Sequence, residues 1–575
     1  MKKFLIISIA ALVAVFTGCK EDFAPPTVSS PAAETVEVSS SVDLSFNYTA
    51  DAGFKSSSVT ATNGTATVTT DGTNGETTGS IVVSFTAGST SGAGSVTITI
   101  MDAEDQAASA TGVLTVFEEG APEVTAPAST SVQVIESVDL TFAFSGEGGY
   151  GSSSVSAENG TAEVSTEPSA GATSGDVVVT FTAGRTADAG SVSLTVTDDN
   201  GKSSFATAVV DVDPFPTVDV DNNIASDVTW TADNIYILGG RITVLDGATL
   251  TIEEGTVIKA RAGSQSNAKA LMIARGGKLM AEGTASAPII FTTVADEILP
   301  GEIVSPNMDP TISGAWGGLL VLGKAPISAV NPSMQIEGVP PSDENGLYGG
   351  TVSDDNSGVI EYISIRHGGA NIGEGNEING LTLAGVGSGT TISHVEIVSN
   401  QDDGVEWFGG SVSVSNVVVW NTGDDAIDAD QSWSGTVDNI AIVNPGDECF
   451  ELDGAEGTME AQYTIKHATA FAGAATKGLV DNDPETWVAM DSIYFFGMDG
   501  SLAELQDFDE IPTEVSSTFT NFEATIPSGK VITDFFPAGL TDISAVAAGQ
   551  NTVGCDVTAF DNWSWAAVVG GLSDF

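Results

Sequence analysis

The chain has 575 residues, is 41% hydrophobic, and carries a formal net charge of -60 from 77 acidic and 17 basic residues. This hydrophobic content is ample for large cores and excludes a globally disordered chain. The acidic excess excludes nucleic acid as a partner, because a phosphate backbone requires a basic footprint, and it disfavours anionic membrane surfaces. The charge suits divalent cations, basic partners or a salty medium, although solubility alone explains most of an acidic surface.

Residues 1–18 predict a signal peptide, because the basic start MKK is followed by an apolar run, ending at Phe16, that is too short to span a bilayer. Residues 16–19, FTGC, resemble a bacterial lipobox, although Leu is commoner than Phe at its first position. This resemblance implies that Cys19 is the lipidated first residue of the mature chain and that residues 19–25 form a tether. The KED that follows Cys19 resembles the acidic signal that sends Bacteroidota lipoproteins to the outer face of the outer membrane. We therefore expect a surface lipoprotein that meets the membrane only through its lipid anchor.

An internal duplication occupies the first third of the chain. SVDLSF at Ser41 returns as SVDLTF at Ser137, and SSSVTATNGTA at Ser56 returns as SSSVSAENGTA at Ser152, both 96 residues later. Each copy alternates apolar and polar residues in short runs between Gly, Ser, Asn and Asp clusters, which is typical of an antiparallel sandwich. Proline-bearing breaks bound the copies. We predict two immunoglobulin-like β-sandwich modules, at residues 26–118 and 122–213, that act as a stalk.

Very short strands broken by Gly and Asp fill residues 219–575, and helical periodicity is nearly absent. Five similar runs (YISIRH, VEIVSN, VVVWNT, IAIVNP and YTIKHA) place their strand ends at Ile365, Val398, Val419, Ile442 and Ile465. Repeats of this size, each with about three short strands, predict a right-handed parallel β-helix. The fold class is therefore all-β, with two tandem sandwiches followed by this β-helix.

A polar column is expected at the turns that follow these strand ends. The equivalent positions are His367, Asn400, Asn421, Asn444 and His467. An amide both donates and accepts hydrogen bonds, so stacked asparagines satisfy one another from coil to coil. We interpret the three asparagines as a structural ladder.

Two stretches extend the likeness to known proteins. GAWGGLLVLGKAPI, from Gly314, and SGVIEYISIRHGGANIGEGNEINGLTLAGVG, from Ser357, resemble a broad set of bacterial lipoproteins and secreted proteins built on a right-handed parallel β-helix. The resemblance covers residues 222–575. It implies the fold and no particular activity.

Residues 400–460 contain fourteen Asp or Glu and no Lys or Arg. Like charges about 5 Å apart in a stack repel each other, and burial increases the cost, so protonation, amide hydrogen bonds or bound cations must compensate. Aligning NQDDGVEWF, NTGDDAIDAD and NPGDECFELD predicts three columns: Asp403, Asp425 and Glu448; Glu406, Asp428 and Glu451; Asp430 and Asp453.

Calcium is the cation that this pattern favours, because Ca²⁺ takes six to eight oxygen ligands from carboxylates and carbonyls. The sequence has neither an EF-hand nor a calcium-binding nonapeptide repeat, so a solvated acidic edge remains an equal alternative. The predicted metal ligands are Asp424, Asp425, Asp428, Asp430, Glu448, Glu451 and Asp453.

A polysaccharide-degrading hydrolase or lyase is the alternative function. NTGDD, NQDD and RHGG resemble motifs of polygalacturonase-type β-helix enzymes, which implies a catalytic set of Asp403, Asp425, Asp428 and His367. The histidine turn nevertheless precedes the acidic coils, which is the wrong order for these motifs. The negative charge of the acidic coils would also repel an anionic glycan. A lyase would also need a basic residue beside Asp425.

Tryptophans interleave with the acidic coils and favour a binding function. Trp433, inside DQSWSG, is predicted to be exposed on a loop, and Trp407 joins it as a candidate contact for a sugar face. Trp563 and Trp565 are expected in an end strand or cap over the last coil. We expect a non-catalytic binding or adhesion protein for a glycan or another cell-surface ligand.

Two cysteines, Cys449 and Cys555, remain after the lipidation site. An oxidising compartment permits a disulfide between them, and two buried thiols are the equal alternative.

Overall fold

The structure is a computed structural model that describes residues 23–371, 378–459, 461–483, 486–498 and 517–575. The predicted signal peptide and Cys19 lie outside these ranges. The chain divides into two compact units, Met1–Pro214 and Phe215–Phe575, and each is considered by itself. No helix in the described ranges combines the length and the apolar character needed to cross a membrane.

The first unit holds two β-sandwiches with the same strand order. Their strands alternate buried and exposed residues, as expected when one face of each sheet packs on a core. The sheets of the first sandwich are β1 (Thr27–Val28), β3 (Ser41–Thr49), β6 (Thr78–Ala87) and β5 (Gly64–Thr70), packed on β2 (Glu34–Glu37), β8 (Ala107–Phe117), β7 (Gly92–Asp102) and β4 (Phe54–Thr62). Those of the second are β9 (Glu123–Thr125), β11 (Ser137–Ser145), β14 (Ser174–Ala183) and β13 (Gly160–Thr166), packed on β10 (Thr130–Gln133), β16 (Ser203–Asp213), β15 (Ala189–Asp198) and β12 (Tyr150–Glu158).

The duplication extends to buried polar groups. The Asp102 carboxylate accepts hydrogen bonds from the amides of residues 104 and 106, and the Asp198 carboxylate accepts them from residues 200 and 202. Each buried carboxylate therefore fixes the same tight turn in its own copy. The prediction of two immunoglobulin-like sandwiches is confirmed.

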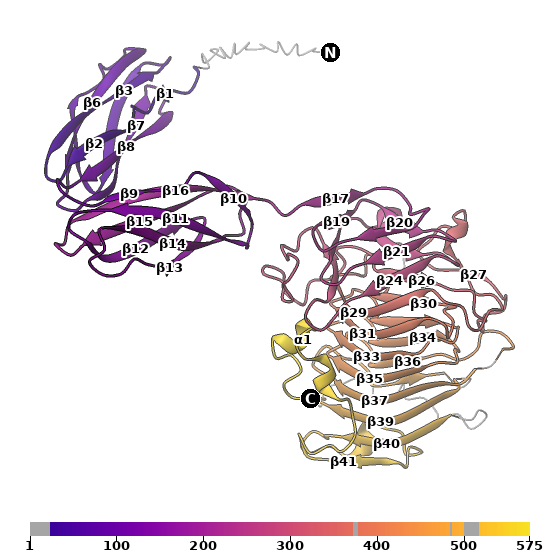
Figure 1. The fold of residues 1–575 in the computed structure, drawn as a ribbon. Helices are drawn as coiled ribbons and strands as arrows, with labels where there is room; N and C mark the ends of the chain where they lie inside the picture. The colour runs from indigo at the N-terminus through magenta and orange to yellow at the C-terminus, as the bar shows by residue number, and fades with distance from the viewer. Residues whose placement is uncertain (1–22, 372–377, 460, 484–485, 499–516) are drawn as a thin grey trace, which may run out of the picture. The chain divides into compact units, whose positions relative to one another are not determined.

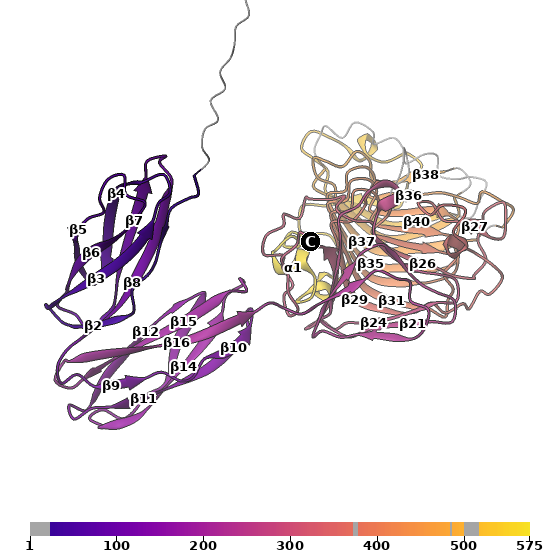
Figure 2. The ribbon, with the colours of Figure 1, turned by 90° about the horizontal axis from the view of Figure 1, so that it is seen from above.

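The second unit is a parallel β-helix with two main sheets (Figures 1 and 2). The long sheet has the order β17 (Thr217–Val220), β19 (Ile235–Leu238), β22 (Val257–Ala260), β25 (Ile289–Thr293), β29 (Gly358–Arg366), β31 (Thr391–Val398), β33 (Val414–Trp420), β35 (Thr436–Val443), β37 (Tyr463–Phe471), β39 (Val488–Phe496), β40 (Thr518–Ala524) and β41 (Ile543–Ala545). Its side branch is β18 (Val228–Trp230), β21 (Thr249–Ile252) and β24 (Lys278–Glu282), which joins at β29. The short sheet is β20 (Arg241–Val244), β23 (Ala270–Ile273), β26 (Leu319–Leu322), β30 (Leu381–Ala384), β32 (Val405–Phe408), β34 (Ile427–Gln431), β36 (Phe450–Leu452) and β38 (Asp481–Asn482).

The remaining elements are short. A two-stranded antiparallel ribbon lies in the loop that leaves β26, and the only α-helix of the described ranges lies near the C-terminus. These elements are β27 (Met334–Gln335), β28 (Leu347–Tyr348), α1 (Trp565–Val568) and the 3₁₀ turns η1 (Gln265–Asn267), η2 (Glu344–Gly346), η3 (Ile532–Asp534) and η4 (Val557–Phe560).

From β29 onward, two strands of each coil merge into one long bent strand. β24 pairs with the first half of β29 and β25 with the second half. The bend falls on one residue with positive φ in every coil, a conformation that Asn adopts more readily than most residues. These residues, which we call the bend column, are Tyr362, His394, Asn416, Asn439, His467, Ser492 and Asn521.

The strand register corrects the predicted turn ladder. The residues paired with one another in successive coils are Ile365, Ile397, Val419, Ile442 and Ala470. The predicted strand end Val398 was therefore one residue too late, and the predicted end Ile465 was five residues too early. The larger error arises because more residues separate β36 from β37 than separate β34 from β35.

Two members of the predicted ladder therefore occupy other positions. His367 is equivalent to Ser399, and not to Asn400, while His467 belongs to the bend column. Asn421 and Asn444 do stack as predicted, because the Asn444 amide donates to Asn421 Oδ1 at 3.2 Å.

Residues 552–575, the C-terminal segment, run back along the outer face of the long sheet. Backbone amides of residues 552, 555, 556 and 566 donate to side chains on β40, β37, β35 and β31 in turn. Both ribbon views place α1 beside the long sheet (Figures 1 and 2). The prediction that Trp563 and Trp565 cap the last coil was wrong, since they pack on the side of the stack, against residues of β29, β31 and β33.

Candidate functional site

Three successive turns carry adjacent pairs of acidic residues from the long sheet to the short sheet. They precede β32, β34 and β36, whose register fixes their alignment. The Gly404 amide donates to the Asp425 carbonyl and the Ala426 amide to the Glu448 carbonyl, so successive turns stack directly. Two turn columns result: an outer column of Asp402, Asp424 and Asp447, which is half-buried, and an inner column of Asp403, Asp425 and Glu448, which is buried.

A third column lies on the outer face of the short sheet. Glu406, Asp428 and Glu451 are paired in register from strand to strand, as the alignment of the three coils with one another predicted. Their neighbours Val405 and Trp407 point into the core, so strand alternation directs these acids outward. We call this the sheet column; Glu406 and Asp428 are nevertheless buried.

Backbone amides compensate part of the charge in the inner turn column. Asp403 Oδ1 accepts a hydrogen bond from the Asp425 amide at 3.0 Å, and Asp425 Oδ1 accepts one from the Glu448 amide at 2.6 Å. Each carboxylate thus bonds to the backbone of the next coil. These bonds explain why the column can form, but they leave most carboxylate oxygens to find other partners.

Several of those oxygens contact other carboxyl groups. The Asp425 carboxyl contacts those of Glu451 and Glu448, and the Glu406 carboxyl contacts that of Asp428. Two carboxylates in hydrogen-bonding contact require a shared proton or a cation between them. The arrangement is therefore complete only when protons or metal ions are bound.

Burial is the main cause of raised pKa values in these columns. It raises the pKa of Asp403, Glu406 and Asp428 well above the ordinary range, and neighbouring carboxylates raise it further. In the turn columns, burial and the Asp447 carboxylate raise the pKa of Asp424 to about 6, and burial is the main cause of a pKa of about 7 for Glu448.

Asp430 and Asp453 form the predicted shorter column beside the sheet column. The Asp453 amide donates to the Ala429 carbonyl, which places Asp453 over Asp430 on the next coil. Burial, together with nearby carboxylates, raises the pKa of Asp430 to about 6 and that of Asp453 to about 7. All three predicted columns are present in the fold.

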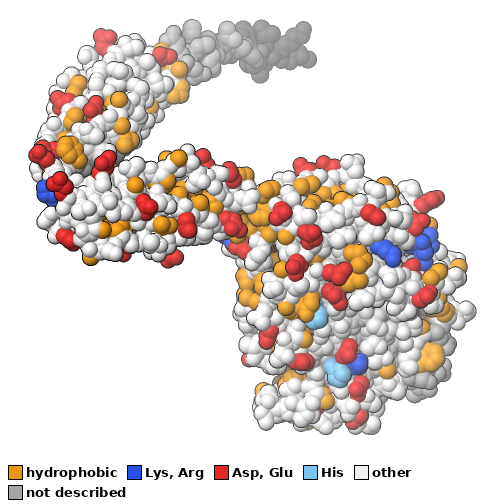
Figure 3. Space-filling model, viewed as in Figure 1, with side chains coloured by type: hydrophobic (Ala, Val, Ile, Leu, Met, Phe, Trp, Pro, Cys, Tyr) orange, Lys and Arg blue, Asp and Glu red, His pale blue; other side chains and the backbone are white. Residues whose placement is uncertain are grey.

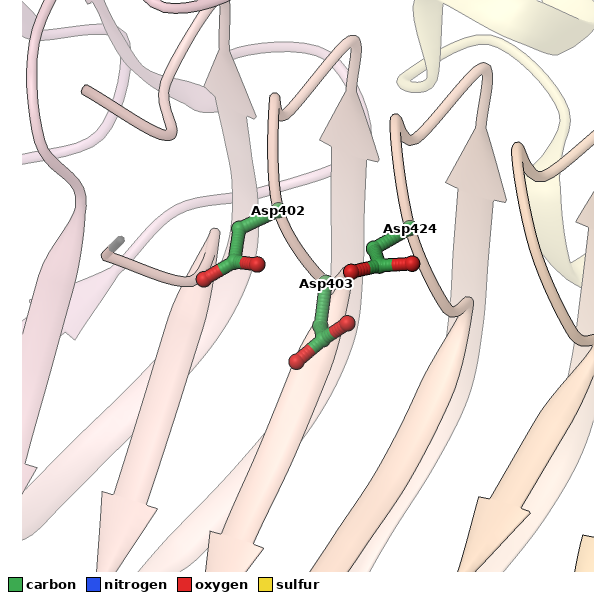
Figure 4. A group of neighbouring side chains, drawn as sticks. All are labelled: Asp402, Asp403 and Asp424. Carbon is green, nitrogen blue, oxygen red and sulfur yellow. The ribbon is translucent and has the colours of Figure 1, made fainter. Parts of the chain in front are cut away.

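Two groups of three carboxylates lie close enough to share one cation. Carboxylate oxygens of Asp402, Asp403 and Asp424 lie within 4.8 Å of one another, as do oxygens of Asp403, Glu406 and Asp428. Figure 4 shows Asp402 and Asp424 on neighbouring turns with Asp403 between them. Asp403 belongs to both groups. The sequence interpretation placed it in an acidic column and in the catalytic alternative, but not among the metal ligands.

The predicted ligands are therefore only partly brought together. Asp424 and Asp428 lie in the two groups, whereas Asp425, Glu448 and Glu451 form the contacts between carboxyl groups described above. Asp430 and Asp453 lie to one side, in neither group of the described residues. Asp402 was missed; the adjacent pairs DD, DD and DE at the three turns were the signal that two turn columns exist.

Non-acidic residues end the columns. Lys477 follows Asp447 in the outer turn column and forms an ion pair with it. Asn379 precedes Asp403 in the inner turn column, and its amide nitrogen donates to Glu406 Oε2. The Asn379 Oδ1 atom is buried without a hydrogen-bond partner, and amide oxygens are ligands that Ca²⁺ accepts.

The predicted exposure of Trp433 was wrong. Trp433 is 1% exposed and stacks on Trp407 inside the β-helix, with ring centroids 5.1 Å apart. Tyr463 continues the stack at 5.5 Å. The loop pattern DQSWSG suggested exposure, but the Trp433 ring packs in the core between the rings of Trp407 and Tyr463. Neither tryptophan is available to contact a ligand from solvent.

His367 does not join the acidic columns either. Its side chain is fully buried beneath the C-terminal segment, its Nδ1 atom pairs with the Ile312 carbonyl at 2.6 Å, and its ring contacts Trp565. Burial lowers the pKa of His367, and the carboxylates that act on it are Asp296 and Asp309. The catalytic set Asp403, Asp425, Asp428 and His367 is therefore not assembled.

The two cysteines lie on opposite sides of the long sheet and are free thiols. Cys449 belongs to the interior core, and Cys555 packs in the outer cluster under the C-terminal segment. Burial raises the pKa of both thiols, that of Cys555 to about 11. Of the two alternatives, the structure has free thiols, with Cys449 buried and Cys555 partly buried.

Lowering the pH should stabilise the cation-free protein. Asp424, Asp430, Glu448 and Asp453 have folded-state pKa values of about 6 to 7, above their unfolded values near 4. Folding therefore favours their protonated forms, so stability is highest below about pH 4 for these groups and falls as the pH rises to about 7. In EDTA, thermal melts should give a higher melting temperature at pH 5 than at pH 8.

The Glu448→Gln variant distinguishes the effect of these four groups from the effect of the overall acidic charge. The melting temperature of this variant should depend less on pH, because one carboxyl group with a raised pKa is removed while the remaining acidic surface is unchanged. An unchanged slope in this variant would contradict the assignment.

The comparison with known protein families agrees with the β-helix architecture of the second unit. The family described as "Pectate-lyase like beta helix domain" matches residues 222–478. No curated protein matches the chain.

Several solved structures resemble about a third of the chain. The sialic acid binding region of a Streptococcus sanguinis SK1 adhesin is 9% identical, covers 34% of this chain and 78% of its own, and has a TM-score of 0.15. Tandem Ig repeats of Dlar are 14% identical, cover 33% of this chain and 98% of their own, and have a TM-score of 0.14. A Porphyromonas gingivalis W83 protein of unknown function is 7% identical, covers 33% of this chain and 100% of its own, and has a TM-score of 0.22.

Proposed function

We propose that this protein is a surface-displayed, non-catalytic binding or adhesion protein whose acidic columns hold Ca²⁺. The observation that carries the proposal is the pair of three-carboxylate groups that share Asp403. Hard cations are suited to such oxygen clusters, and a bound ion would relieve the repulsion that burial increases. In this role Ca²⁺ has a structural function, and the ligand would be a glycan or another cell-surface molecule.

The location of the protein is part of the same proposal. A lipid on Cys19 would hold the chain on the outer face of the outer membrane, and the sandwich modules would act as a stalk for the β-helix. The excess of acidic residues supports a partner other than nucleic acid.

Polysaccharide degradation remains the second candidate, and the match to a pectate-lyase-like family favours it. The buried position of His367 removes the histidine from the catalytic set that the sequence suggested. A hydrolase would then depend on carboxylates alone, with one kept protonated by burial.

A glycan panel tests both candidates. The mature chain should retain one class of glycan or a cell surface, without releasing new reducing ends or unsaturated products. Binding should weaken in EDTA and recover with CaCl₂.

The same panel applied to Asp425→Ala decides between them. If the wild-type chain turns over any glycan and Asp425→Ala abolishes that turnover, the non-catalytic proposal is overturned and the degrading enzyme takes its place. Asp233→Ala, an exposed acidic residue of the same unit outside the columns, is the matched control.

A further inference from the structure

A polar groove of about 510 Å³ lies on the outer face of the long sheet, away from the acidic columns. Its floor is formed by Ser415, Asn416, Asp438, Asn439 and His467, from β33, β35 and β37. Its other wall is the C-terminal segment, through Gly554, Asp556 and Ala559. The volume falls within the range of about 300–1,000 Å³ that is typical of small-molecule sites.

The bend column gives this groove a fixed row of polar groups. Asn416, Asn439 and His467 all adopt positive φ, which directs their side chains outward from successive coils. The Asn439 amide donates to Asn416 Oδ1 at 2.7 Å. Asn439 Oδ1 in turn accepts from the Asp556 amide at 2.6 Å, which holds the C-terminal wall in place. The row is therefore rigid before any ligand arrives.

His467 is held with one ring nitrogen committed and the other open. Its Nδ1 atom lies 2.7 Å from Asp438 Oδ1, and Asp438 Oδ2 lies 3.0 Å from Lys466 Nζ. Because Asp438 takes a hydrogen bond from Nδ1, the Nε2 atom remains for a partner in the groove. The His467 side chain is 48% exposed, so that atom can be reached from solvent. Figure 3 shows histidine on this face next to basic and acidic side chains.

The lining selects the chemistry of the ligand. Asp438 is already matched by Lys466 and His467, so it offers little to a cationic ligand. The other lining carboxylate, Asp556, accepts hydrogen bonds from the Thr558 amide and hydroxyl. The net charge of the chain, -60, repels anionic ligands. Ala559 and Gly554 provide too little apolar surface for an apolar ligand. Hydroxyl groups, which both donate and accept, match the amides, the Ser415 hydroxyl and the imidazole.

We propose that this groove binds a neutral carbohydrate, with His467 Nε2, Ser415 and Asn416 contacting its hydroxyl groups. The inference rests on the proposed binding function and gives it a site. It also separates the two roles within the β-helix: the acidic columns stabilise the coils, and the groove on the other sheet recognises the ligand.

Two variants test the groove and leave the bonds of its asparagine row and its C-terminal wall in place. His467→Asn keeps a residue that tolerates positive φ, as Asn416 and Asn439 do at the same place in neighbouring coils, but it withdraws the ring nitrogen. Ala559→Trp adds bulk to the C-terminal wall and breaks no side-chain bond.

The matched control is His394→Asn, the same change in the same column, outside the residues that line the groove. His394 Nε2 lies 3.0 Å from the Asn416 amide nitrogen, and an asparagine oxygen can accept that bond, as Asn416 Oδ1 does from Asn439.

The experiment is calorimetric titration of the calcium-loaded full chain with neutral oligosaccharides of glucose, mannose or galactose, and with uronic-acid oligomers as the anionic arm. We expect a neutral oligosaccharide to bind, His467→Asn to weaken it about tenfold, Ala559→Trp to abolish it, and His394→Asn to leave it within about twofold. Melting temperatures confirm that each variant is folded.

Three outcomes would overturn the inference. If the neutral oligosaccharide binds equally to wild type and Ala559→Trp, the groove is wrong and the binding function stands. If only uronic-acid oligomers bind, the ligand class is wrong. If the wild type binds no carbohydrate and no cell surface, the groove and the proposed function fail together.

Discussion

Removal of divalent cations should lower the melting temperature of the β-helix by about 5 °C or more. An ion present at 100 times its dissociation constant stabilises a protein by about 2.7 kcal/mol, and each kcal/mol moves the melting temperature of a large domain by about 2 °C. The reason lies in the two carboxylate groups that share Asp403, where burial makes repulsion costly. Thermal melts in EDTA and in millimolar CaCl₂ measure the difference.

The Asp403→Asn variant should remove most of the difference between the melting temperatures in EDTA and in CaCl₂. Without cations it should melt at the same temperature as wild type or higher, because one buried charge is gone while its oxygen can still accept the Asp425 amide. With CaCl₂ most of the gain should be lost, because both groups lose a negatively charged ligand, although the amide oxygen remains. Asp233→Asn should leave both temperatures unchanged. A wild-type melting temperature that is the same in EDTA and in CaCl₂ would rule out calcium in this role.

Arg366→Ala should destabilise the β-helix strongly, by about 3–5 kcal/mol. Arg366 and Glu396 are both fully buried, 3.8 Å apart, under the C-terminal segment. The guanidinium also lies 4.9 Å from the Trp565 ring, and Glu396 Oε1 accepts the Ala566 amide at 2.9 Å. Removal of the arginine leaves Glu396 buried without its counter-charge. Urea denaturation followed by tryptophan fluorescence measures the loss.

Two further variants serve as controls for the loss of stability in Arg366→Ala. Arg261→Ala, which breaks a half-exposed pair with Asp219, should cost less than about 1 kcal/mol. Replacing both buried partners, as Arg366→Met with Glu396→Leu, should cost less than Arg366→Ala, because no charge is then left unpaired. A loss below about 1 kcal/mol for Arg366→Ala would show that the pair has little structural importance.

The architecture could be predicted from the sequence because its signals are local and repeated. The copies at Ser41 and Ser137 alternate with period two, and the β-helix repeats short apolar strands at nearly constant spacing. The acidic columns could be predicted for the same reason, since nearly equal spacing through β32, β34 and β36 puts equivalent residues in register.

Other features could not be predicted because they depend on contacts between distant segments. The bend inside the long strands is set by one backbone angle per coil, which no residue type marks uniquely: the bend column contains Tyr, His, Asn and Ser. The burial of Trp433 depends on the stack with Trp407 and Tyr463, and that of His367 depends on the C-terminal segment, nearly 200 residues further along the chain.

The path of the C-terminal segment has a consequence for how the stack opens. In a simple solenoid each coil touches only its neighbours, so terminal coils can peel away one at a time. Here the last residues of the chain are tied to β40, β37, β35 and β31 in turn. The final coil cannot peel off without pulling on a coil from the middle of the stack. Because the C-terminal segment links these coils, we expect them to unfold together in one cooperative step and not one at a time.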